Sequence, residues 1–353
     1  MFEPSSISVS DYLDLWLHEY AEKQLKSTTI LGYRKRIKNH IKPVIGSYYL
    51  QDVDHITLQR LLDMKYDQGY SLNTIISIKG ILNKAFSYAH TVLRYIQYNP
   101  AQYIQMPSKN RKPKNDARRV KVDIVSHEVF QEIIERFPKG HSCHIPLMLG
   151  YWCGMRLGEV FALTWDDIDF ENKTIDINKQ VQMDETVKQW QFSSPKYDSF
   201  RIISMDEEVF KLLLRTKQKQ DSEKKIANQF NCYKELYVDK DRLLSYEKKT
   251  GSKKVNPIMR RPEGDFITPR VTQHLGRIVH YQLGYTNFRF HDLRHSHATM
   301  LIDNKVDPIV VKERMGHKRI QTTIDTYTHI TNQIRIEPAD ALNKIKKCPQ
   351  TSK

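Results

Sequence analysis

The 353-residue chain carries 56 lysine and arginine residues against 41 aspartate and glutamate residues, a formal charge of +15 at pH 7. Its length and its 39% hydrophobic content allow a sizeable core and two domains, and the basic balance indicates a polyanionic partner. The four cysteines form no CxxC pair, which argues against a disulfide scaffold or a cysteine zinc site. No signal peptide or membrane-spanning stretch is recognisable, so we expect a cytoplasmic protein without a membrane partner.

Residues 1–107 are predicted to form a helical domain. Ser8 and Asp11 have capping-box spacing at the start of a first helix, whose apolar face consists of Val9, Tyr12, Leu13, Trp16 and Tyr20. A second helix over residues 27–41 aligns Ile30, Tyr33, Ile37 and Ile41. Two further helices are expected over residues 54–66 and 71–96, before a stop at Asn99 and Pro100.

Basic residues in the second helix and in the segment after the domain have two interpretations each. On the helix, Arg34, Lys35 and Lys38 form either a solvated face or a phosphate-facing surface. Residues 108–122 have too few apolar side chains to fold, and they form either a soluble tether or a basic strap across a nucleic-acid backbone. The basic residues of this linker are Lys109, Arg111, Lys112, Lys114, Arg118 and Arg119.

Residues 123–353 are predicted to form a second, mixed domain. Helices are expected over residues 126–137 and 143–153, followed by short strands over 167–170, 174–178 and 200–205 that form a small antiparallel sheet. The lysine-rich segment 217–265 is predicted to be a helix plus an exposed loop, and helices dominate from there to the C-terminus. The fold class is therefore mainly α with a small antiparallel β-sheet (α+β).

Polar residues stand out in four stretches: CGMRLGEV, SSPKYDSFR, HDLRHSHATM and MGHKRIQTTIDTYTHI. In the third, His291 and Arg294 are three residues apart, so on a helix they form a pair of donors for an anion. His295 and His297 are expected to point elsewhere, as hydrogen-bonded core or supporting histidines. Metal binding by these histidines is disfavoured, because no carboxylate or cysteine lies at ligand spacing and HEXXH is absent.

In the fourth stretch, Asp307 and Pro308 predict the start of a helix, and Gly316 predicts its end in the left-handed conformation. His317 then lies just beyond a helix end. Tyr327 shares a helical stripe with isoleucines, which by itself indicates a core aromatic residue.

Phosphoryl transfer is a reaction in which all of these types of polar residue could act together. Two arginines and one or two histidines can stabilise the charge that a phosphodiester accumulates under attack, without a metal. A tyrosine hydroxyl can act as the nucleophile, and a lysine can protonate the departing alcohol. Six residues are of the types that these roles require: Arg156, Lys196, His291, Arg294, His317 and Tyr327.

In their order along the chain, CGMRLGEV, HDLRHSHATMLIDN and MGHKRIQTTIDTYTHI resemble the arginine, HxxR and histidine–tyrosine boxes of tyrosine recombinases, the phage and transposon integrase family. The resemblance covers residues 119 to about 345, and the preceding helical segment resembles the family's core-binding, SAM-like domain. It implies a site-specific recombinase that integrates or excises a mobile element in a bacterial host. It also implies a two-domain, C-shaped clamp around double-stranded DNA.

The resemblance also implies a role for each residue. Arg156 and Arg294 would hold the scissile phosphate, His317 would donate to its oxygens, and His291 would assist proton transfer from the nucleophile. Tyr327 would form a 3′-phosphotyrosyl link, and no cofactor or metal is expected. Lys196 would be the general acid, with Lys188 as a rival, and Glu159 would support the site structurally.

The tail over residues 328–347 resembles the family's subunit-docking segment, which implies a homotetramer on paired sites. An accessory directionality or DNA-bending factor is a family expectation. The first helix starts almost at once, so an arm-binding domain is either absent or truncated. The alternative functions are a non-cleaving DNA-binding protein on this fold and a tyrosine-type topoisomerase that acts as a monomer.

Overall fold

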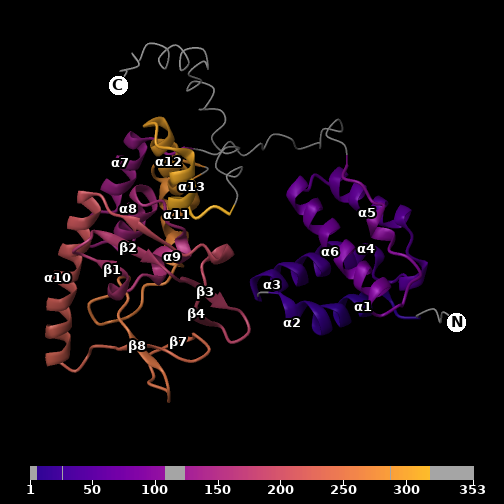
Figure 1. Ribbon diagram of the computed structural model, residues 1–353, viewed down its shortest axis with the longest axis horizontal. Coiled ribbons are helices and arrows are strands. Elements are labelled where there is room, and N and C mark those ends of the chain that lie inside the picture. Colours follow the sequence, from indigo (N-terminus) through magenta and orange to yellow (C-terminus); the bar gives the residue numbers. More distant parts are fainter. Residues whose placement is uncertain (1–5, 26, 108–123, 287, 319–353) are drawn as a thin grey trace, which may run out of the picture. The chain divides into compact units, whose positions relative to one another are not determined.

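The computed structural model describes residues 6–25, 27–107, 124–286 and 288–318. The chain divides into two compact units, Met1–Lys121 and Val122–Lys353. Helices predominate in both, and the strands of the described part all belong to the second unit (Figure 1). The predicted fold class, mainly helical with small antiparallel sheets, is confirmed.

The first unit is built from helices that share one apolar core. They are α1 (Val9–Trp16), α2 (Glu22–Gln24), α3 (Ser27–Arg36), α4 (Lys42–Ile45), α5 (His55–Asp67) and α6 (Leu72–Thr91). π-helical turns at Leu17–Ala21 and Ile37–Ile41 join α1 to α2 and α3 to α4. The four predicted helices are thus present, and their apolar faces meet around fully buried residues such as Trp16 and Phe86.

The ends of these helices follow local chemistry. Ser8 Oγ accepts a hydrogen bond from the Asp11 backbone N–H at 3.0 Å, as its capping position predicts. Helix α6 ends at Thr91, short of the predicted Ile96, because the chain turns at Arg94 with a left-handed φ of 54°. Asn99 then caps a short 3₁₀ turn, Pro100–Gln102.

The second unit contains seven helices in its described part: α7 (His127–Arg136), α8 (His144–Trp152), α9 (Leu157–Ala162), α10 (Glu207–Gln229), α11 (Val271–Tyr281), α12 (Phe290–Asp303) and α13 (Pro308–Met315). Helix α12 packs along α8 (Figure 1). Gly150 permits this approach, because a Cβ there would lie 2.9 Å from the Phe290 ring. The contact places the α8–α9 turn beside α12.

Three small antiparallel sheets complete the described part of the second unit. The predicted sheet is confirmed: β1 (Ile168–Asp169), β2 (Thr174–Ile177) and β5 (Arg201–Ser204) lie in the order β1-β2-β5. A hairpin of β3 (Gln180–Asp184) and β4 (Gln189–Ser193) separates β2 from β5. Helix α13 begins after the Asp307 cap and ends at Gly316 with φ 62°, as predicted.

The prediction of a helix plus exposed loop over residues 217–265 is half wrong. Its helical part belongs to α10, but the remainder contains a sheet of β6 (Leu236–Val238), β7 (Leu244–Ser245) and β8 (Lys253–Val255). These strands are too short to show alternation, and only a few apolar side chains such as Leu236 and Leu244 are buried. Among the described residues, no helix has an apolar run long enough to cross a membrane.

Candidate active site

The C-terminal end of α13 is the point around which the candidate site is organised. A helix end leaves backbone carbonyls without intrahelical partners, and here three consecutive carbonyls each accept a hydrogen bond from a different arginine. Arg201 Nε donates to the Arg314 carbonyl at 2.8 Å, Arg294 Nη2 to the Met315 carbonyl, and Arg156 Nη2 to the Gly316 carbonyl at 2.8 Å. The guanidinium groups from α9, α12 and β5 are thereby brought together.

Arg294 projects from α12 and is 1% exposed. Its Nη1 donates to the Gly154 carbonyl at 2.7 Å, in the turn between α8 and α9. Gly154 adopts φ 63°, and a Cβ there would lie 2.6 Å from the His297 ring. Arg294 therefore fixes the turn that carries Arg156 relative to the end of α13.

Arg156 lies at the N-terminus of α9 and is held by a buried carboxylate. Its Nη1 donates to Glu159 Oε1 at 2.6 Å and to Ser199 Oγ at 3.0 Å, while Glu159 Oε2 accepts from the Arg156 backbone N–H at 2.9 Å. Arg201 donates to both oxygens of Glu159, from Nη1 to Oε1 at 3.1 Å and from Nη2 to Oε2 at 2.8 Å. Glu159 thus orients both arginines, the supporting position expected from sequence.

The ionisation of Glu159 is secured by these arginines. The side chain is completely buried, which by itself raises the pKa of the carboxyl. The hydrogen bond and charge of Arg201, with the charges of Arg156 and Arg294, outweigh burial and hold the pKa at about 2. The carboxylate is therefore charged at neutral pH.

Two histidines, His291 and His317, lie close enough to Arg156 and Arg294 for the charges of these arginines to act on them. Burial first, then the charges of Arg294 and Arg156, lowers the pKa of His317 to about 3. Burial also lowers the pKa of His291, which lies at about 4. The charges of His295, of the same two arginines and of Lys196 add to this effect, although part of the His291 side chain is exposed. Both imidazoles are neutral at pH 7, so each offers one N–H donor and one acceptor nitrogen.

The expectation that His295 points away from His291 is wrong. Their rings meet edge to face with centroids 4.7 Å apart, because residues four apart lie on one face of a helix. His297, in contrast, is buried as a supporting residue. Its Nδ1 lies 3.0 Å from the Tyr151 carbonyl, and its Nε2 accepts from Arg314 Nε at 3.0 Å, so neither nitrogen is available to a metal.

The two candidate lysines occupy different places. Lys196 begins the short turn Lys196–Asp198 after β4, and its charge contributes to the lowered pKa of His291, which puts it beside the cluster. Lys188 lies at the tip of the β3–β4 hairpin, where it forms a 2.5 Å ion pair with Glu185. The charge of Lys196 thus acts on His291, whereas Lys188 is paired with Glu185.

The structure thus brings together five of the six residues expected to act: Arg156, Lys196, His291, Arg294 and His317. Tyr327 and the basic linker residues lie outside the described residues. In the first unit, Lys35 and Lys38 are exposed, and Arg34 forms an ion pair with Glu22. The stretch SSPKYDSFR stands out in the sequence, but no role was assigned to its Ser199 or Arg201, because their spacing gives no signal.

Both units of the chain match models of known protein families. A family model described as the phage integrase family matches residues 125–333, and one described as the phage integrase N-terminal SAM-like domain matches residues 8–65. The chain is 24% identical over 356 residues to a tyrosine recombinase XerC-like protein of Caldanaerobacter subterraneus subsp. tengcongensis, covering 96% of this chain and 83% of that protein. It is 27% identical over 327 residues to the ICEBs1 integrase of Bacillus subtilis, covering 89% and 78%.

Solved structures show the same fold. The Tn1549 transposon integrase in complex with a circular intermediate DNA matches with a TM-score of 0.69 and 20% identity, covering 98% of this chain and all of that one. A lambda integrase tetramer bound to a Holliday junction matches with a TM-score of 0.62 and 15% identity, covering 91% and 78%.

The protein belongs to the phage integrase family, whose model spans more than half of the chain. It is a tyrosine recombinase, an enzyme of DNA cleavage and rejoining, and its relatives include the integrase of Staphylococcus phage L54a and transposase A of transposon Tn554.

Proposed function

We propose that this recombinase integrates or excises a mobile element by attacking a DNA phosphate with Tyr327. Arg156 and Arg294 would hold the nonbridging oxygens, where negative charge accumulates during attack. The support for this assignment is the end of α13, where both guanidiniums bind neighbouring carbonyls, Met315 and Gly316, just before His317. The cluster gathers positive charge where one phosphate can be held by several donors.

The protonation states favour defined proton movements. Attack by the Tyr327 oxygen on phosphorus forms the 3′-phosphotyrosyl bond and breaks the bond to the 5′ oxygen. The hydroxyl proton of Tyr327 passes to neutral His291, and Lys196 protonates the departing 5′ oxygen. His317 donates its N–H to a phosphoryl oxygen. The link retains the bond energy, and attack by a 5′-hydroxyl of the partner duplex reverses the chemistry.

The partner proposed for both units is double-stranded DNA in the cytoplasm of a bacterial host. The comparison structures include integrases bound to DNA, one of them a lambda integrase tetramer on a Holliday junction. By analogy, the working form proposed is a homotetramer on paired sites, with a C-shaped clamp around each duplex. We also propose that an accessory factor sets the direction of the reaction or bends the DNA. The linker bases and the surface of Arg34, Lys35 and Lys38 would neutralise backbone phosphates.

Covalent trapping tests the nucleophile. The purified protein is incubated, in the presence of a chelator, with nicked duplexes derived from the ends of the element, and adducts are resolved after denaturation. Wild type should form a protein–DNA adduct, and Tyr327→Phe should not. Tyr281→Phe is the matched control, because Tyr281 is 80% exposed at the end of α11.

The outcomes separate the proposal from its alternatives. An adduct that persists in Tyr327→Phe contradicts the assignment of the nucleophile. Tight binding without any adduct in wild type indicates a non-cleaving DNA-binding protein. Relaxation of supercoiled DNA by a monomer without paired sites indicates a topoisomerase.

A further inference from the structure

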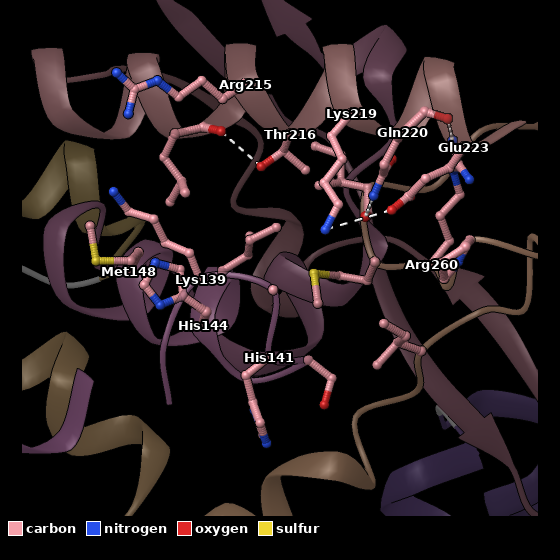
Figure 2. A pocket seen from close by; sticks show the side chains of 18 of the residues that line it. Lys139, His141, His144, Met148, Arg215, Thr216, Lys219, Gln220, Glu223 and Arg260 are labelled. Carbon is pink, nitrogen blue, oxygen red and sulfur yellow. Dashed lines mark hydrogen bonds and ion pairs between the residues drawn. The ribbon is translucent and has the colours of Figure 1, made fainter. Parts of the chain in front are cut away.

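A cavity of about 470 Å³ lies in the second unit, away from the cluster of Arg156, His291, Arg294 and His317. It is formed by the turn before α8, by α10 and by the segment over residues 258–267 (Figure 2). Helix α8 starts here at His144 and runs nine residues to Trp152, so the cavity and the cluster lie at opposite ends of a helix about 13 Å long. The volume falls within the range of small-molecule sites.

The polar wall of this cavity is mainly cationic. Lys211, Arg215 and Lys219 follow one face of α10 at intervals of four residues, and Lys139 and Arg260 join them from loops. The carboxylates in the lining are Glu208 and Glu223. Only the second has a lining cation as partner in the described part of the chain, Lys219 at 3.6 Å.

The side chain of Arg260 gives the clearest indication that this cavity binds a ligand. The residue is only 6% exposed, and its guanidinium lies 5.3 Å from the centre of the Tyr233 ring. Nη2 donates to the Gln220 carbonyl at 2.8 Å, but the buried Nε has no hydrogen-bond partner among the described residues. An unpaired donor on a buried charged group is costly, and an anion would satisfy it.

Apolar side chains form another part of the wall, with Ile145, Met148, Leu212, Ile258 and Met259 among the lining residues. Two histidines add polarity without charge. Burial, followed by nearby positive groups, lowers the pKa of His141, and burial also lowers the pKa of His144. The Cys143 backbone N–H donates to His141 Nδ1 at 3.1 Å, which leaves the proton of the neutral ring on Nε2 as a donor.

We propose that this cavity binds an organic anion in which a phosphate or carboxylate group is joined to an apolar body. The anionic group would lie against Lys219 and Arg260, and the apolar body against Met148 and Met259. The tail of the chain is a poorer occupant, because residues 328–347 carry four basic and two acidic side chains and so have the same charge sign as the wall.

Methionine-methyl NMR with 1-naphthyl phosphate tests the proposal on the full chain. The sequence has 10 methionines, so each carbon-13-labelled methyl signal can be assigned with Met→Leu variants. Titration should shift the Met148 and Met259 signals, which report on the cavity, and leave Met64 in the first unit unchanged. Inorganic phosphate and 1-naphthol, each lacking one half of the probe, should bind at least tenfold more weakly.

A charge variant and its control decide whether the basic wall is responsible. Lys211→Gln combined with Lys219→Gln should weaken binding of 1-naphthyl phosphate about tenfold, because the contact of Lys219 with the anionic group and the nearby charge of Lys211 are both lost. Lys225→Gln removes a lysine from the same helix that does not line the cavity, and should leave the affinity unchanged.

Three results would overturn the proposal. Equal affinity for 1-naphthol would mean that the cavity selects only an apolar body. Unchanged affinity in the double variant would remove the role of the wall. Loss of the probe on addition of an unnicked duplex, with no shift left at Met148, would assign these lysines to the DNA interface.

Discussion

Replacing Glu159 by Gln should destabilise the second unit and remove a defined part of its pH dependence. The substitution preserves the shape of the side chain but leaves Arg156 and Arg201 against a neutral amide in a fully buried place. A pKa held at about 2 instead of 4.5 corresponds to about 3 kcal/mol of stabilisation at pH 7. Breaking a buried pair by removing one partner costs about 3–5 kcal/mol, so both routes give a similar magnitude.

Urea unfolding followed by tryptophan fluorescence measures this loss. Three of the four tryptophans, Trp152, Trp165 and Trp190, report on the second unit. Because the folded pKa of Glu159 is depressed, its contribution is complete above pH 4.5 and is lost as the pH falls toward 2. Wild type should therefore lose about 3 kcal/mol more than Glu159→Gln across that interval.

The exposed Glu171→Gln is the matched control and should behave as wild type. A Glu159→Gln protein within about 0.5 kcal/mol of wild type at pH 7, the usual range for surface substitutions, would refute the reasoning. So would an unchanged pH dependence, since it would mean that Glu159 does not carry the buried charge.

Arg294→Lys should keep DNA affinity within about threefold while slowing adduct formation about 10²–10³-fold in single-turnover assays, because the donors of Arg294 act on the charge that develops during attack. Equal losses of affinity and of cleavage rate would indicate a purely structural arginine. Lys196→Gln should slow cleavage about 10²–10⁴-fold on ordinary DNA. Its rate should recover on a duplex with a 5′-bridging phosphorothiolate, whose leaving group needs no proton, whereas Lys188→Gln should match wild type on both; an unrescued Lys196→Gln would remove it as the acid. Neutralising four linker bases together should reduce the slope of log affinity against log salt by about 3–4, measured by fluorescence anisotropy, and an unchanged slope would return the linker to a tether. Those four are Lys109, Arg111, Lys112 and Lys114.

Features that depend on near neighbours in the chain were predictable from the sequence. The capped start of α1, the Asp307 cap and the left-handed Gly316 each require only local backbone geometry, and all three are confirmed. The face shared by His291 and Arg294 also follows from helical spacing. The same spacing rule places His295 beside His291, so this contact also follows from the sequence.

Residues whose role comes from distant partners could not be recognised in this way. Arg201 opens a short strand and has no distinctive spacing, yet it binds both Glu159 and the end of α13. Likewise, the sheet of β6, β7 and β8 depends on pairing between strands too short to carry a periodic signal.

The sequence by itself determined which side chains could do the chemistry, because residue type and order along the chain identify the boxes of a recombinase. Only the tertiary structure decided how those side chains are held. The carbonyls at the end of α13 lack partners within their own helix, and arginines from α9, α12 and β5 satisfy them. That convergence of segments far apart in sequence places Arg156, Arg294 and His317 around a common point.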